Sequence, residues 1–197
     1  MPVIRLIALP MMIFLAGCSQ VGPAEAADNA PPANIPIAGF TLTSPELTEG
    51  GVLPAALKCT RDGGEGITPP LKWGYIPPGT KSLALMMYHY PRGTSEGIDA
   101  PSQYWLLWNF PPETRSLPRG NPESIGDEGA DKDEKRTGYT PPCSPPGSQH
   151  EYTITLYALN ASLDTLPARD DPDVDWSAMK TAMKGKIVGS SSISFLN

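Results

Sequence analysis

The chain has few of the residues that build catalytic and metal centres. Its 197 residues include only two histidines, His89 and His150, and three cysteines. Two histidines are a thin ligand set for a metal ion, so we expect no metal and no other cofactor. No residue supplies a convincing nucleophile. A weak hydrolase that uses His150 as a general base, assisted by Tyr139 or Glu151, is therefore only an alternative.

Positive charge is also scarce. The 15 lysines and arginines are outnumbered by 21 aspartates and glutamates, which gives a formal net charge of −6 at pH 7. Nucleic acid is therefore not expected as a partner. An anionic membrane surface is expected to be contacted only through a lipid. The run of mixed charge from Gly126 to Arg136 is typical of a solvated loop.

Hydrophobic runs long enough to cross a bilayer are absent as well. The apolar stretch from Leu6 to Phe14 is shorter than the roughly 20 residues of a membrane-spanning helix, and Pro10 interrupts it. A single charge, Arg5, precedes this stretch. The pattern predicts an export signal over residues 1–17.

A short motif follows the apolar stretch. Leu15-Ala16-Gly17-Cys18 resembles the lipobox of bacterial lipoproteins, which implies a lipid on Cys18. Ser19 then favours the outer membrane, with the protein facing the periplasm; the alternative is a secreted protein that is cut elsewhere. Residues 18–38 have few large apolar side chains, so we expect a lipidated cysteine and a flexible tether there. Residues 39–197 are expected to fold as one domain.

The two other cysteines, Cys59 and Cys143, are expected to form a disulfide, because an exported protein folds in an oxidising compartment. The bond would stabilise the fold by roughly 4 kcal/mol, since it would close a long loop. Two buried free thiols are the alternative. A catalytic cysteine is a weaker one, because neither residue has a recognisable base beside it except His150.

Short strands separated by proline and glycine predict an all-β domain. The strands are expected at Phe40–Leu42, Ala56–Thr60, Ser82–Tyr88, Tyr104–Phe110, Tyr152–Leu159 and Lys186–Phe195. One short helix is expected near the C-terminus, where Trp176, Met179 and Met183 recur at helical spacing before Lys184-Gly185. Buried core positions are expected for these two methionines and for three other tryptophans, Trp73, Trp105 and Trp108.

The segment from Gly138 to Tyr152 is a proline-stiffened loop that leads a histidine into a strand. Its four prolines fix the backbone and remove hydrogen-bond donors, so the loop is largely preformed. The strand that follows, Tyr152–Leu159, consists of β-forming residues that alternate with period two. We therefore expect His150 at the rim of a pocket.

Several segments share the pattern of one protein family. They are Phe40–Pro45, Leu57–Thr60 with Thr68–Trp73, Pro77–Leu85, Tyr104–Pro111 and Arg136–Tyr152. Together they resemble the phosphatidylethanolamine-binding protein (PEBP) family, in its bacterial Raf kinase inhibitor-like branch. The resemblance implies a Greek-key β-sandwich, with a large central antiparallel sheet, a smaller sheet and a short C-terminal helix. It also implies a small pocket for an anion, in a protein that binds or modulates rather than catalyses.

The pocket residues depart from the family pattern. Where the family has Asp-Pro-Asp-x-Pro, this chain has His89-Tyr90-Pro91-Arg92-Gly93, and Tyr104 replaces a pocket histidine of the family. We therefore expect a less acidic pocket, with Arg92 nearby. Its six residues are expected to be His89, Tyr90, Tyr104, Tyr139, His150 and Tyr152.

The expected function is that of an envelope lipoprotein that binds a small anionic group, such as phosphate, a phospholipid head group or a carboxylate. A protein-interaction or inhibitor module that acts through its surface is the first alternative, and the weak hydrolase is the second. The expected partners are the small anion and the membrane, reached through the lipid on Cys18. A protein partner or a homodimer is left open.

Overall fold

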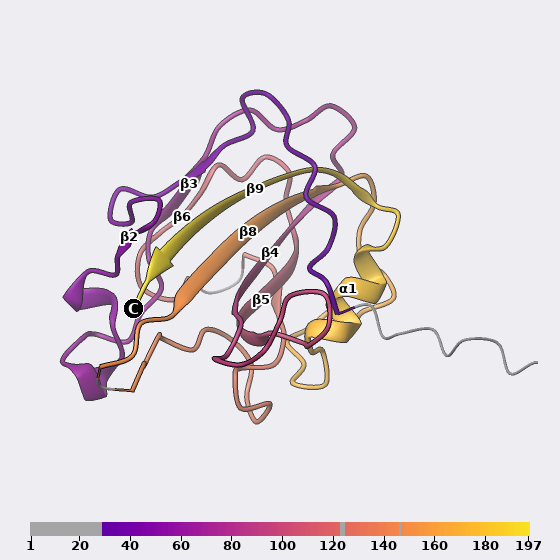
Figure 1. The fold of residues 1–197 in the computed structure, drawn as a ribbon. Coiled ribbons are helices and arrows are strands. Elements are labelled where there is room, and N and C mark those ends of the chain that lie inside the picture. The colour runs from indigo at the N-terminus through magenta and orange to yellow at the C-terminus, as the bar shows by residue number, and fades with distance from the viewer. Residues whose placement is uncertain (1–28, 123–124, 146) are drawn as a thin grey trace, which may run out of the picture.

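Two β-sheets and one α-helix form the domain in the computed structural model, which describes residues 29–122, 125–145 and 147–197 (Figure 1). The smaller sheet has the order β1 (Leu42–Thr43), β3 (Leu71–Trp73), β6 (Ser116–Leu117). The larger sheet has the order β2 (Gly51–Val52), β9 (Ile187–Leu196), β8 (Glu151–Leu159), β4 (Ser82–His89), β5 (Ser102–Phe110), β7 (Asp127–Glu128). Its strand pairs are antiparallel except for the short β2, which runs parallel to β9.

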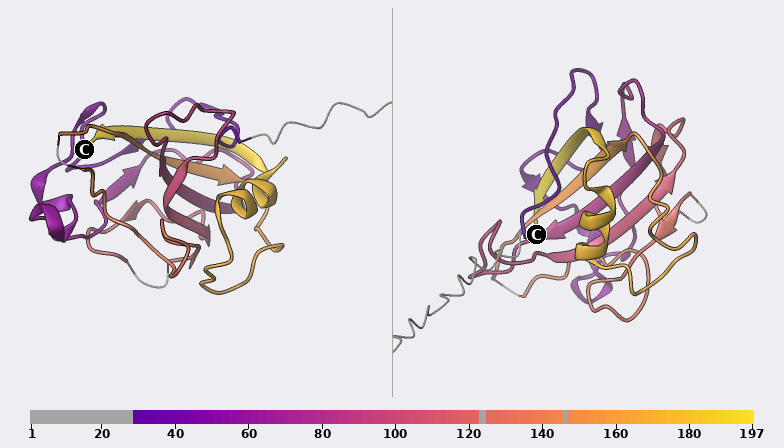
Figure 2. Two further views of the ribbon diagram at one scale, coloured as in Figure 1. Left: turned by 60° about the horizontal axis from the view of Figure 1, so that its bottom comes forward. Right: turned by 90° about the vertical axis from the view of Figure 1, so that its right-hand side faces the viewer.

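The larger sheet separates two apolar cores. Leu85 and Met87 of β4 face the core shared with the smaller sheet, whereas Ala84 and Met86 face the core beneath α1 (Trp176–Met183). Figure 2 shows α1 lying against one face of this sheet. Because both faces are covered, β4 is apolar along most of its length instead of alternating between polar and apolar residues.

The predicted fold class and helix are confirmed. Asp175 caps α1, because its carboxylate accepts a hydrogen bond from the backbone N–H of Ala178 at 2.8 Å. Met179 and Met183 are fully buried on the inner face of the helix. The three tryptophans expected in the core are also buried: Trp73 and Trp105 in one core, and Trp108 in the other.

The strand predicted at Ala56–Thr60 is wrong. This segment forms two short 3₁₀ turns, Ala55–Leu57 and Thr60–Asp62. Pro54 precedes the first turn, and its carbonyl accepts the N–H of Leu57 at 3.0 Å. The chain then folds back on itself, since the N–H of Glu65 donates to the carbonyl of Ala56 at 2.8 Å. The segment therefore forms its hydrogen bonds in turns and with a loop, and not in a sheet.

The last part of the predicted tether is docked on the domain. Ser190 of β9 holds it: its hydroxyl accepts the N–H of Ile35 at 2.6 Å and donates to the side-chain oxygen of Asn34 at 2.9 Å. The N–H of Ser190 also donates to the carbonyl of Ile35 at 2.7 Å. The described part of the predicted tether, residues 29–38, is therefore held on the domain by hydrogen bonds and by Ile37, which packs against the core. The flexibility predicted for residues 18–38 does not extend to these residues.

The predicted export signal and Cys18 lie outside the described residues, and both stay predictions. In the part of the chain that the structure describes, the only α-helix is too short to span a membrane.

Candidate ligand-binding site

Four of the six predicted site residues lie in one cluster of aromatic rings at one end of the larger sheet. His89 ends β4, Tyr104 lies near the start of β5, and His150 and Tyr152 flank the start of β8. The ring of His89 stacks on that of Tyr152, with centroids 4.9 Å apart and planes 9° apart. It meets Tyr104 and His150 edge-on, at 5.3 and 5.1 Å. The strand order brings the rings together, because β4 lies between β5 and β8.

His89 is the buried centre of this cluster. Its side chain is 7% exposed. Burial, with smaller contributions from His150 and Lys132, lowers the pKa of its imidazole to about 4, so the ring is neutral at pH 7. Its Nδ1 has no hydrogen-bond partner among the described residues. His89 therefore contributes an aromatic ring to the packing, and at pH 7 it offers no positive charge for binding an anion.

The two tyrosines of the cluster, Tyr104 and Tyr152, are buried as well. Burial, and then the neighbouring Tyr152, raise the pKa of the Tyr104 phenol, which keeps its proton at any physiological pH. Tyr152 is fully buried and stacks on Phe195 at 5.6 Å. The cluster thus forms an apolar base, and any charge at this site must come from residues nearer the surface.

The cluster reaches the surface at His150, where a hollow of about 410 Å³ begins. The hollow is lined by Tyr90, Arg92 and residues 147–151. Arg92 is exposed and His150 is half-buried, and Glu151 is the one carboxylate among these lining residues. His150 therefore contacts the buried His89 and also lines a hollow that contains a guanidinium group.

Tyr90 lies in this hollow and outside the ring cluster. Burial, with the nearby Glu96 and Tyr88, raises the pKa of its phenol to about 12. The hydroxyl is therefore protonated at neutral pH and can donate a hydrogen bond. Its ring lies edge-on to Tyr88 at 6.0 Å.

The predicted disulfide between Cys59 and Cys143 is confirmed, with the two Cα atoms 5.3 Å apart. It fixes the loop before His150 to the 3₁₀ turns. Two hydrogen bonds support it: the N–H of Cys59 donates to the carbonyl of Pro142 at 3.1 Å, and Arg61 donates to the carbonyl of Ser144 at 2.7 Å. The proline-rich loop is thus held in place on both sides of Cys143.

The backbone of His150 is fixed from the other direction. Its N–H donates to the carbonyl of Asn197 at 2.8 Å, and its carbonyl accepts the N–H of Asn197 at 2.9 Å. The hydroxyl of Ser144 also donates to the Asn197 carbonyl, at 2.8 Å. The backbone of His150 is therefore fixed by hydrogen bonds to Asn197, the residue after β9, which is consistent with the expectation of a preformed pocket rim.

One group of potential metal ligands occurs among the described residues: Cys59, Asp62 and Cys143. The two cysteines are joined in the disulfide and offer no thiolate. The group is therefore a poor metal site.

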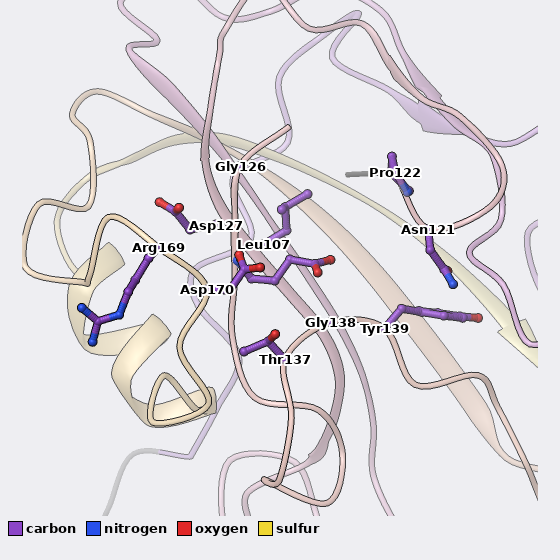
Figure 3. A pocket seen from close by; sticks show the side chains of 11 residues that line it. Leu107, Asn121, Pro122, Gly126, Asp127, Thr137, Gly138, Tyr139, Arg169 and Asp170 are labelled. Carbon is purple, nitrogen blue, oxygen red and sulfur yellow. The ribbon is translucent and has the colours of Figure 1, made fainter. Parts of the chain in front are cut away.

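Tyr139 does not join the ring cluster. Its ring lies edge-on to Trp105 at 5.7 Å. It lines a different and larger cavity, of about 690 Å³, which Asp127 of β7 also lines (Figure 3). Its hydroxyl has no hydrogen-bond partner among the described residues, and burial raises the pKa of this phenol. Four of the six predicted residues thus lie in the ring cluster and Tyr90 lies in the adjoining hollow, whereas Tyr139 lines a separate cavity.

The larger cavity is acidic, and the sequence did not reveal it. Asp127, Glu128 and Asp170 line it together with Arg169 (Figure 3). Glu128 accepts a hydrogen bond from the indole N–H of Trp105 at 2.7 Å, and burial raises the pKa of its carboxyl group. The solvated loop predicted for residues 126–136 is therefore wrong in its first part, because Asp127 and Glu128 pair with β5 as strand β7.

A serine motif was also missed. Residues 93–97, Gly-Thr-Ser-Glu-Gly, fit the Gly-x-Ser-x-Gly pattern of many serine hydrolases. In that pattern the serine stands on a sharp turn from a strand into a helix. Here the segment forms turns in an exposed loop between β4 and β5, and the N–H of Ser95 donates to Asp99 at 2.9 Å. The loop lacks the geometry of a nucleophile.

The sequence is similar to those of one family of known proteins. Residues 43–196 match the family model described as phosphatidylethanolamine-binding protein. A UPF0098 protein of Methanothermobacter thermautotrophicus is 32% identical over 157 residues, which cover 76% of this chain and 93% of that protein. YbhB of Escherichia coli is 32% identical over 126 residues, covering 60% of this chain and 77% of YbhB.

Two crystal structures have a similar fold. CT736 of Chlamydia trachomatis, described as a PEBP homologue, superimposes with a TM-score of 0.67 at 26% identity, over 81% of this chain and 97% of that chain. YbcL of E. coli, described as a member of the mammalian PEBP family, gives the same TM-score at 22% identity, over 81% and 98%. The second similarity concerns the fold alone.

Proposed function

This chain belongs to the phosphatidylethanolamine-binding protein family, and on that premise we propose that it is an envelope lipoprotein that binds a small anionic group in the hollow beside His150. The anion is a phosphate, a phospholipid head group or a carboxylate. The observation that carries this proposal is the position of His150, which joins the rigid ring cluster to a hollow that Arg92 also lines.

The chemistry of the lining supports an anion. Arg92 offers a guanidinium group that pairs with phosphate or carboxylate oxygens through two parallel N–H bonds. An imidazole N–H of His150 and the phenol of Tyr90, which keeps its proton, add further donors. The packed rings behind His150 hold it in place, so little conformational entropy is lost when a ligand binds.

Binding is favoured over catalysis by the state of the nearby hydroxyl groups. Ser144 donates its hydroxyl to the carbonyl of Asn197 at 2.8 Å, and Ser148 donates to that of Pro145 at 2.6 Å. Neither hydroxyl donates to His150, so neither is arranged as a nucleophile with its base. We therefore propose a binding protein or modulator, and not a hydrolase.

The lipoprotein part of the proposal depends on the motif Leu15–Cys18. It is tested by the mass of the N-terminal peptide of the protein purified from membranes. A diacylglyceryl-modified Cys18 at the new N-terminus supports it, and an unmodified Cys18 refutes it.

The anion site is tested by NMR titration of the protein with phosphate, phosphorylethanolamine and acetate, following Arg92 and His150. We expect saturable shifts at both residues, and Arg92→Gln should weaken binding about tenfold because it removes a charge-assisted hydrogen bond. Arg115→Gln is the matched control, because Arg115 is an exposed arginine whose side chain, among the described residues, donates only to the carbonyls of Pro112 and Thr114. Shifts confined to Tyr139, or none at millimolar ligand, would refute the site. A partner protein retained by the Arg92→Gln and His150→Gln variants would instead support the surface-mediated alternative.

A further inference from the structure

The first described residues join two distant parts of the domain into one continuous surface. The side-chain amide of Asn29 donates to the carbonyl of Ile98 at 2.8 Å, in the loop between β4 and β5. The next residue, Ala30, accepts a hydrogen bond from the ammonium group of Lys180 in α1. In Figure 1 this indigo segment starts beside α1 and crosses β9 near the beginning of that strand. We name the surface formed by residues 29–35, Ile98 and residues 180–187 the exit face.

An apolar groove of about 420 Å³ crosses the exit face. Pro31 and Ile35 line one side of it, and Met183 and Ile187 line the other. Lys180 and Lys184 border the groove, and no carboxylate is among the described residues that line it. In a chain with a formal net charge of −6, this combination of apolar lining and positive border is complementary to the surface of an anionic bilayer.

A second apolar group lies at the other end of the exit face. Ile98 is 73% exposed, which is the largest exposed fraction of the three large hydrophobic side chains that stand out from the described surface. The neighbouring Asp99 is turned back into its own loop, where it accepts the N–H of Ser95 at 2.9 Å. Glu96 is the exposed carboxylate of this loop, and it lies two residues from Ile98. The side chain of Ile98 is therefore exposed, and neither Glu96 nor Asp99 forms an ion pair beside it among the described residues.

The length of the chain before Asn29 brings this face to a membrane if Cys18 is anchored. Eleven peptide steps separate Cys18 from Asn29, and they span at most about 40 Å in any conformation. Because residues 29–35 are bound to the domain, the chain enters the domain at the exit face.

We propose that the exit face docks on an anionic phospholipid bilayer. Lys184 contacts lipid phosphates, and Ile98 and the apolar groove meet the boundary between head groups and acyl chains. This inference rests on the anchor proposed above only to bring the face near the bilayer, and it is independent of the anion site.

The test is hydrogen–deuterium exchange of the full chain, added to or reconstituted in vesicles of phosphatidylcholine alone or mixed with phosphatidylglycerol. We expect exchange to slow at residues 93–99 and 180–187 only when the anionic lipid is present. Lys184→Gln should lower the affinity for anionic vesicles about fivefold, and Ile98→Ser about tenfold or more. Both should reduce the slowing.

Val52→Ser and Lys72→Gln are the matched controls. Val52 is 67% exposed in β2, and Lys72 is an exposed lysine in β3 of the smaller sheet. Both should leave the slowing unchanged.

Three results would overturn the proposal. Equal exchange in the two kinds of vesicle excludes electrostatic docking, and slowing near Val52 or Lys72 assigns the contact to another face. Slowing without lipid that grows with protein concentration assigns the exit face to a second copy of the chain. An unmodified Cys18 would refute the anchor but not the docking, because the comparison is also made on protein added to preformed vesicles.

Discussion

The buried imidazole of His89 should make the stability of this protein depend on pH. In the unfolded chain its pKa is near the ordinary value of 6.5, whereas in the folded protein burial lowers it to about 4. Between these values the unfolded chain binds a proton that the folded protein excludes, so the free energy of unfolding falls as the pH falls. The loss begins near pH 6.5, reaches about 2 kcal/mol at pH 5 and tends to about 3 kcal/mol below pH 4.

The variant His89→Phe isolates this contribution. Phenylalanine retains a ring that can stack on Tyr152, carries no titrating group and removes the unpartnered Nδ1. Urea unfolding at several pH values between 5 and 7.5 should show a smaller loss of stability in the variant, by about 2 kcal/mol. Tyr152→Phe is the matched control, since it alters the same cluster but leaves His89, and it should keep the loss seen in the unmodified protein. If His89→Phe keeps the full loss, the imidazole is not buried as the structure shows.

Two further predictions concern the support of the site. Replacing both Cys59 and Cys143 with serine should lower the free energy of unfolding by about 4 kcal/mol, since the bond closes a loop with a sequence separation of 84 residues; urea unfolding measures this, and a loss below about 1 kcal/mol would mean that the unfolded chain is barely constrained by the bond. Glu128→Leu should cost about 1–3 kcal/mol, because it leaves the buried indole N–H of Trp105 without its acceptor. Glu128→Gln should cost less, since its amide oxygen can still accept, and equal losses in the two variants would contradict this reasoning.

The parts of the fold with a clear hydrophobic pattern could be predicted from the sequence. The long strands β4, β5, β8 and β9 have runs of β-forming residues bounded by proline and glycine, and α1 has helical spacing with a capping aspartate. The two-residue strands β1, β2, β6 and β7 are too short to show a period. Ala56–Thr60 was misinterpreted because Leu57 reaches the core from a 3₁₀ turn, where period and propensity are weak guides.

The candidate site was only partly predictable. The resemblance to the family named His89, Tyr104 and Tyr152 as pocket residues. The structure shows why they meet, because they lie at the same end of three adjacent strands, an order that the sequence did not supply. Tyr139 lies in a loop, where no period fixes the direction of a side chain, and it turned out to contact Trp105. The acidic cavity combines residues 127–128 with residues 169–170, and no local pattern in the sequence links these two segments.

The position of β9 has a consequence for how the molecule acquires its structure. This strand is the last of the described elements, yet it pairs with β2 and also holds Asn34 and Ile35 through Ser190, across sequence separations of up to 156 residues. Strand β2 and residues 34–35 lack these partners until β9 is in place, so this part of the domain cannot assemble before β9 does. Contacts between residues so far apart in the sequence slow folding. Until they form, the unpaired edges of the incomplete sheet are exposed and can aggregate. A chaperone that binds the unpaired strands would reduce this risk until β9 has paired.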